Sequence, residues 1–157
     1  MFLTSSNLSI PDLRVEYNVT RPWTYTHPDF SYAHRDKSLG SPYGPSSKAI
    51  RIESFYFPIP KIIIESSFEH VLKGMGNGAN VSDNYDNRNE DLDWDTKFFL
   101  DDKQKFTELN ISINYILSDL LRLRSTISIS ETFNPYLYSE SRTYSEEKFI
   151  LGVDFSW

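Results

Sequence analysis

The last nine residues of the chain constrain its fold most, because apolar side chains alternate there with polar or small ones. The apolar positions are Phe149, Leu151, Val153, Phe155 and Trp157. A period of two is typical of a strand with two unlike faces. A soluble protein rarely ends on such a strand, since an edge of this kind invites pairing with other chains. A transmembrane β-barrel needs one, because its last strand closes the sheet and shows apolar side chains to lipid.

The end of this strand carries a glycine, alternating apolar residues and a terminal aromatic ring. The residues are Gly152, Val153, Phe155 and Trp157. They resemble the C-terminal signal by which bacterial barrel proteins are recognised for insertion into the outer membrane. The alternative interpretation is an ordinary core strand that happens to end on tryptophan.

Charge and composition exclude several classes. The chain has 157 residues, no cysteine and a net charge of -6. Disulfides and thiolate metal sites are therefore impossible, and nucleic acid is not an expected partner. No apolar run approaches the ~20 residues of a spanning helix, so any membrane contact is made by strands. The first residues lack a secretory signal, so we expect either a fragment of an exported protein or a mature segment that begins at an incidental methionine.

Alternating side chains predict six strands, over residues 13–25, 48–57, 61–73, 105–117, 120–132 and 146–157. Their connections alternate in length. Pro58-Ile59-Pro60 and Ser118-Asp119 form short turns, whereas residues 26–47, 74–104 and 133–145 form long loops. Outer-membrane barrels have short periplasmic turns and long extracellular loops, and a soluble sandwich has no reason to sort its loops in this way.

The sequence thus predicts an all-β protein, an antiparallel transmembrane β-barrel in the outer membrane of a Gram-negative bacterium. Outer-membrane lipid and the barrel-assembly machinery are the implied partners. Six strands are fewer than the ~8 of the smallest single-chain barrels. Either several chains complete one barrel, or these are the C-terminal strands of a larger one, which is the interpretation we favour.

The first strand and the loop after it carry a resemblance to a known family. Residues 16–27 read EYNVTRPWTYTH, residues 32–34 read YAH, and residues 39–45 read LGSPYGP. This pattern, dense over residues 12–46, resembles the capsule-assembly outer-membrane barrels of the Wzi-like family. The loop has Ser41 and Tyr43 where the family pattern has a histidine and a leucine. The resemblance implies a non-catalytic barrel that retains or organises surface polysaccharide.

The same loop holds the side chains that a sugar-binding site uses, namely aromatic rings and planar hydrogen-bonding groups. The candidate glycan-binding residues are Arg21, Trp23, Tyr25, His27, Tyr32, His34 and Tyr43. The alternative is structural, since these rings could instead pack the loop into the mouth of the barrel.

The sequence gives little support for a metal site or for catalysis. The acidic residues between Asp83 and Asp95 lack the spacing of a calcium loop, and His27 and His34 have no third ligand nearby. No Gly-x-Ser-x-Gly is present. We therefore predict no catalytic residue, no metal and no cofactor. Two alternative functions stay open: a porin-like channel and a soluble β-sandwich that binds carbohydrate.

Overall fold

The computed structural model describes residues 2–3, 10–26, 33–34, 37–76, 78–88, 103–118, 121–134 and 142–155. Its strands and its short 3-10 turn are β1 (Phe2–Leu3), β2 (Asp12–Thr20), β3 (Ala33–His34), β4 (Lys37–Ser38), β5 (Ser47–Ile59), β6 (Ile62–Gly74), η1 (Tyr85–Asn87), β7 (Lys103–Ser118), β8 (Leu121–Asn134) and β9 (Arg142–Phe155).

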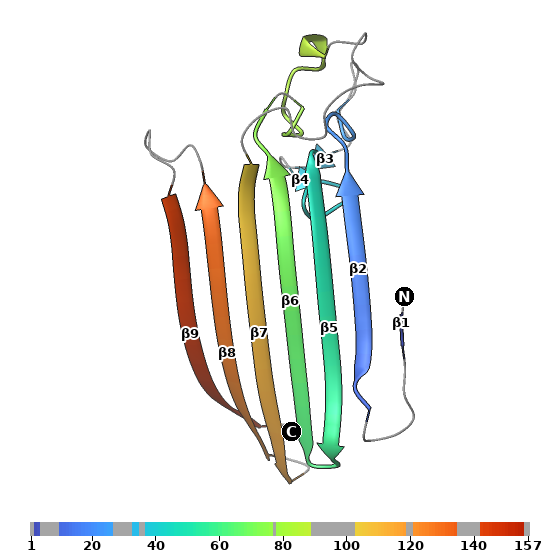
Figure 1. Cartoon of the computed structure of the whole chain (residues 1–157). Helices are drawn as coiled ribbons and strands as arrows, with labels where there is room; N and C mark the ends of the chain where they lie inside the picture. The colour runs from blue at the N-terminus through green and yellow to red at the C-terminus, as the bar shows by residue number, and fades with distance from the viewer. Residues whose placement is uncertain are drawn as a thin grey trace.

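Six long strands form one antiparallel sheet in the order β2-β5-β6-β7-β8-β9, with β1 added beside β2. Each long strand pairs with the next long strand along the chain, so the sheet is a meander (Figure 1). The predicted all-β class and its six antiparallel strands are confirmed. The sheet is open: within the part of the chain that the structure describes, β9 pairs only with β8.

The first long strand is shorter than predicted. The alternation continues to Tyr25 in the sequence, but β2 ends at Thr20. Trp23 has a φ of 63°, in the left-handed region that a bulky side chain rarely adopts, and residues 22–25 form a turn. A strand cannot pass through this conformation, so the loop begins earlier than the side-chain pattern indicates.

The predicted turn at Pro58-Ile59-Pro60 is also shifted. Pro58 and Ile59 belong to β5, Ile59 pairs with Ile62, and the reversal occurs at residues 60–61. The register shifts between Tyr56 and Ile59, which marks a β-bulge. A bulge tolerates a proline because the ladder is already interrupted there.

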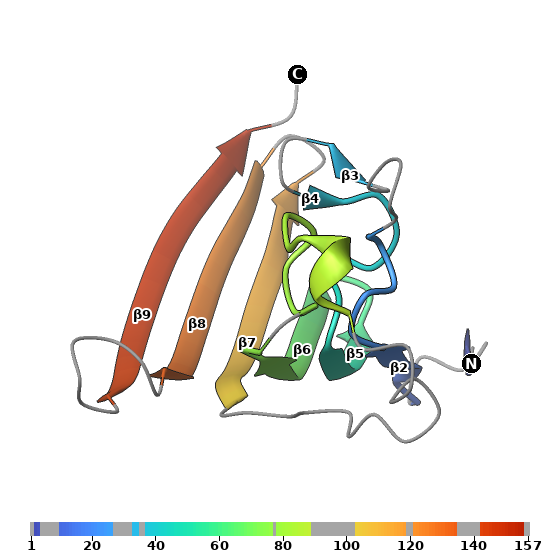
Figure 2. The ribbon, with the colours of Figure 1, turned by 90° about the horizontal axis from the view of Figure 1, so that it is seen from above.

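The connections between the six long strands sort by length between the two ends of the sheet. The two-residue connections 60–61 and 119–120 lie at one end, and the connections 21–46, 75–102 and 135–141 lie at the other. The short strands β3 and β4 and the turn η1 lie at the end with the long connections (Figures 1 and 2). These three elements, like β1, are too short for a side-chain pattern to predict.

Register makes the two faces of the sheet unlike, since residues paired across strands point to the same face. One row of paired residues across the sheet consists of Val15, Ile52, Phe68, Leu109 and Ile129. The rows nearer the two-residue connections carry further aliphatic and aromatic residues. We call this side the apolar face. Its members include Val15, Tyr17, Ile52, Tyr56, Ile62, Ile64, Phe68, Leu109, Ile111, Ile113, Tyr115, Leu121, Leu123, Ile127, Ile129, Phe149, Leu151 and Val153, with serines at 54, 66 and 125 between them.

The opposite side, the polar face, carries charged and hydrogen-bonding side chains in the same register. They include Arg14, Glu16, Asn18, Arg51, Glu53, Glu65, Ser67, Glu69, Asn110, Ser112, Asn114, Arg124, Thr126, Ser128, Ser130 and Lys148.

The sheet has almost no conventional hydrophobic core. Among the described residues, the buried apolar side chains are Ala49, Val71, Ala79 and Val81. On the apolar face, by contrast, large side chains such as Ile113 (47% exposed) and Leu151 (74%) are open. Burial of aliphatic surface usually drives folding, so this face lacks the cover that a folded β-protein in water would give it. No helix in the described ranges is long and apolar enough to cross a membrane.

Candidate ligand site on the polar face

Residues 41–47, which we call the strap, comprise the end of the first long connection and the first residue of β5. The strap begins with a turn in which the Gly44 N–H donates to the Ser41 carbonyl (3.1 Å). Gly44 has a φ of 70°, which suits glycine because it has no side chain to clash. The Ser47 hydroxyl then donates to the Gly44 carbonyl (2.7 Å). These local bonds fix the course of the strap before it meets the sheet.

Hydrogen bonds from the end of strand β6 hold the strap against the sheet. The Lys73 ammonium group donates to the carbonyls of Tyr43 (3.2 Å) and Pro45, and the Gly74 N–H donates to the Ser46 carbonyl (2.8 Å). Pro45, Ser46 and Ser47 are buried as a result. The strap therefore lies fixed on the sheet.

Tyr43 points from the strap onto the polar face. Its hydroxyl donates to Glu69 Oε1 at 2.6 Å. Partial burial, the hydrogen bond to Glu69 and the negative charge of that carboxylate raise the pKa of Tyr43 to about 12. The ring is therefore neutral and keeps its hydrogen bond throughout the physiological pH range.

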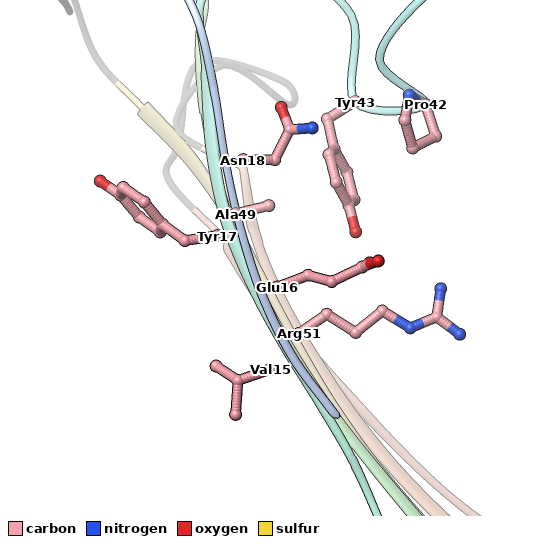
Figure 3. Close-up of a pocket in the computed structure, with 8 residues that line it drawn as sticks. All are labelled: Val15, Glu16, Tyr17, Asn18, Pro42, Tyr43, Ala49 and Arg51. Atoms are coloured by element: carbon pink, nitrogen blue, oxygen red, sulfur yellow. The ribbon is translucent and has the colours of Figure 1, made fainter. Parts of the chain in front are cut away.

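A cleft of about 430 Å³ lies between the strap and strands β2 and β5. Figure 3 shows Tyr43 and Pro42 on its strap side, with Asn18, Glu16 and Arg51 reaching from the sheet on the same side. Val15 and Tyr17, which also border the cleft, point to the opposite side of the sheet (Figure 3). The cleft thus combines an aromatic ring with a carboxylate, a guanidinium and an amide.

The charges beneath this cleft form a chain of ion pairs. Glu53 accepts from Arg14 (3.3 Å) and from Arg51 (2.6 Å), and Arg14 also pairs with Glu16. The acids and bases of this cluster balance each other, so the wall of the cleft has no large excess of either sign.

A second cleft, of about 320 Å³, lies on the other side of Tyr43. It is bordered by Glu69 and Lys73 of β6, by Phe106 of β7 and by Thr132 of β8. Val71, a small apolar residue, borders it as well, as Ala49 does in the first cleft. These small side chains leave room on the sheet for the Tyr43 ring.

Two of the predicted glycan-binding residues, Trp23 and Tyr25, make contacts between loop segments. The backbone N–H of Trp23 donates to the Gly78 carbonyl (3.0 Å). The Trp23 indole lies so close to Gly78 that a Cβ added to this glycine would be 2.5 Å from it. Tyr85 meets Trp23 edge to face at 6.1 Å between ring centroids. The Tyr25 hydroxyl accepts from the Ser41 N–H (2.6 Å), and the Tyr25 ring lies against Gly40.

The remaining predicted residues are placed only in part. The Arg21 side chain is exposed, and its carbonyl accepts from the Ser46 N–H (3.2 Å). His27 and Tyr32 lie outside the described residues, and His34 is placed by its backbone in β3. The structure therefore puts Tyr43 on the polar face and puts Trp23 and Tyr25 in the packing between loops.

The predicted membrane-assembly signal lies on β9. Gly152 pairs with Arg124, Val153 pairs with Leu123 and is exposed, and Phe155 pairs with Leu121. Trp157 lies outside the described residues.

The sequence placed Glu16, Arg51 and Glu69 on the charged face of the strands but did not predict that they, with Asn18 and Lys73, form part of a binding site. The sequence shows these residues as the polar positions of alternating strands. Only the register between β2, β5 and β6 shows that they lie side by side. Within the described ranges, no three His, Cys, Asp or Glu residues are grouped as metal ligands.

The fold and the site define an all-β chain with one open antiparallel sheet, an exposed apolar face and a charged face crossed by a strap. Comparison with protein-family models, curated proteins and solved structures finds no match to this chain.

Proposed function

We propose that this chain forms part of the wall of an outer-membrane β-barrel that helps retain or organise surface polysaccharide without catalysis. The apolar face then contacts lipid, and the polar face lines the interior of the barrel. Further strands, from the same polypeptide or from other chains, complete the wall.

The observation that carries this proposal is the exposed apolar face. In β8 it extends from Leu121 to Ile129, eight residue steps or about 27 Å along the strand at ~3.4 Å per residue. At a strand tilt of ~40°, this corresponds to about 21 Å of height. The apolar band of outer-membrane barrels is about 25 Å tall. Lipid is thus a solvent of suitable polarity and thickness for this face.

The distribution of connections supports the same orientation. Between the six long strands, two-residue connections at one end and long connections at the other match the periplasmic and extracellular ends of such barrels. A β-sandwich would need a second sheet about 10 Å above the apolar face. In the described part of the chain, the only other sheet is the two-stranded β3-β4 pair, and large side chains of the apolar face are exposed.

The polysaccharide role is supported by the site at the end with the long connections. Tyr43 presents a ring beside carboxylate, guanidinium and amide groups, which together can cover a sugar face and bond its hydroxyls. No nucleophile paired with a base appears in this cleft, so binding is its best-supported activity.

Placing an arginine on each face of β8 tests the membrane orientation. We expect Ile127→Arg to destabilise the full-length protein in phospholipid vesicles by about 2–4 kcal/mol, because it puts a charge in lipid. Ser130→Arg, on the polar face beside Glu108 and Glu146, is the matched control and should change stability little. The measurement is urea-induced unfolding from vesicles.

Equal effects of the two substitutions would contradict the proposed orientation. So would a wild-type protein that stays monomeric and folded in buffer without detergent or lipid.

A porin-like channel is the second candidate, favoured by the mixed charges of the polar face, which suit a water-filled interior. It predicts steady conductance when the full-length protein is inserted in a planar bilayer. The strap narrows that interior, so a closed barrel without conductance would favour the polysaccharide role.

A further inference from the structure

We infer that the two clefts beside Tyr43 are one continuous site for an uncharged oligosaccharide that crosses the polar face beneath the strap. This inference rests on the proposed polysaccharide role and adds to it the location of the site and the class of ligand.

The two clefts are continuous because Tyr43 borders both. The first takes its walls from β2 and β5, and the second from β6, β7 and β8. These five strands are adjacent, so the site extends over four strand spacings, or about 19 Å at ~4.8 Å each. A site of this length suits a chain of several sugar units.

Each cleft offers an aromatic surface. Tyr43 overhangs both, and Phe106 of β7 lies on the polar face in register with Val71 and Thr132. The Phe106 side chain is half-buried there. Sugars bind aromatic rings through their apolar C–H faces, so two rings at different points of the site can hold different units of one sugar chain.

The charged groups of both clefts already have bonding partners, and each cleft has as many acidic as basic side chains facing it, which indicates a neutral ligand. In the first cleft Arg51 is paired with Glu53, and Glu16 with Arg14. In the second, Glu69 accepts from Tyr43, and Lys73 donates to strap carbonyls. An acidic sugar would have to compete with these partners, whereas neutral hydroxyls can bond to their remaining donor and acceptor positions.

Lys105 also borders the second cleft, but it does not alter this balance. It pairs with Leu72 and Phe133, in a row whose side chains point to the apolar face, and its ammonium group lies 5.7 Å from the centre of the Phe133 ring. Its contribution to the cleft wall is therefore its backbone.

Calorimetry on the full-length protein in lauryldimethylamine oxide micelles, a detergent without sugar, tests the inference. The probes are maltose, maltohexaose and the acidic hexagalacturonate. We expect maltohexaose to bind more tightly than maltose, because it can fill both clefts, and hexagalacturonate to bind no more tightly than maltohexaose.

Four variants assign the binding to the site. Tyr43→Ala should weaken maltohexaose binding at least tenfold. Tyr43→Phe, which keeps the ring, should weaken it only a few-fold, and Phe106→Leu should weaken maltohexaose more than maltose. Tyr115→Ala is the matched control, since Tyr115 borders neither cleft and lies exposed on the apolar face, in register with Ile62 and Leu123. It should leave binding unchanged.

Three results would overturn the inference: no binding of maltohexaose by the wild type, tighter binding of hexagalacturonate, or equal losses in Tyr115→Ala and Tyr43→Ala. Phe106→Leu keeps the strap contacts intact, so it decides the matter if Tyr43→Ala does not fold. A protein that passes the arginine test in vesicles but fails here retains its membrane role and loses only this ligand.

Discussion

At the scale of single residues, Trp23 is the most informative side chain, because its contacts compensate for a strained backbone. Trp23 adopts a positive φ, at a cost of the order of 1–3 kcal/mol, and offsets it by packing on Gly78 and Tyr85. This contact joins two loops that are more than fifty positions apart in the sequence. The sequence identified Trp23 as notable but could not show that its partner is a glycine.

Gly78→Ala tests the contact between these loops. Gly78 has a φ of 80°, and an added Cβ would meet the Trp23 indole at 2.5 Å, so we expect a local loss of about 1–3 kcal/mol. Amide hydrogen exchange at residues 21–26 and 78–81 should then accelerate. Gly152→Ala is the control, because its Cβ would meet only Arg124 Cβ, at 3.9 Å. Unchanged exchange in Gly78→Ala would refute this role of Trp23.

The raised pKa of Tyr43 predicts how its contribution to stability depends on pH. Its pKa is raised from the ordinary value of 10 to about 12, chiefly by burial and then by the hydrogen bond to Glu69. The stabilisation from this hydroxyl is therefore fully present below about pH 10 and is lost as the pH rises through 12. The difference in phenolate absorbance between wild type and Tyr43→Phe should have its midpoint near pH 12. A midpoint near 10 would mean that Tyr43 is not held on the polar face.

At the scale of elements, alternation predicts where strands occur better than where they end. β7 follows the pattern from Leu109 to Tyr115 because every second side chain there meets the same environment. β2 departs from it after Thr20, since a contact with a distant loop decides the backbone of Trp23. Pairing in the sheet brings Tyr43 to Glu69, and neither residue reveals that meeting in its own segment.

Insertion of a short epitope tag tests the two kinds of connection. Between Tyr138 and Ser139, within a seven-residue connection, we expect the tag to be tolerated and to bind antibody on intact cells. Between Asp119 and Leu120, in a two-residue connection that fixes the register of β7 and β8, it should impair assembly and stay hidden. Surface exposure of the second tag would reverse the proposed orientation.

At the scale of the whole molecule, the open sheet is the dominant feature. Among the described residues only Phe2 and Leu3 pair with the outer edge of β2, and none pairs with the outer edge of β9. Unpaired backbone groups cost several kcal/mol each in lipid. A membrane-embedded form must therefore pair both edges, which the sequence also predicted from its six strands.

Hydrogen exchange along β9 tests this requirement. Alternate amides of an edge strand point outward, away from β8. In the membrane-embedded full-length protein, we expect the outward amides between Phe149 and Val153 to be protected as strongly as the inward ones. Rapid exchange of the outward set alone would show a free edge and would contradict a closed barrel. The inward amides of the same strand serve as the internal control.

The placement of the three long connections between the six long strands at one end has a kinetic consequence. In a barrel that inserts from the periplasm, these segments must pass through the bilayer, whereas the two-residue turns can stay behind. The segment between β6 and β7 carries Asp83, Asp86, Glu90, Asp91, Asp93 and Asp95. Moving this charge through hydrocarbon has a free-energy cost that the pairing of strands does not have. The translocation of one acidic loop, rather than the formation of the sheet, would then set the time that the protein needs to reach its native state.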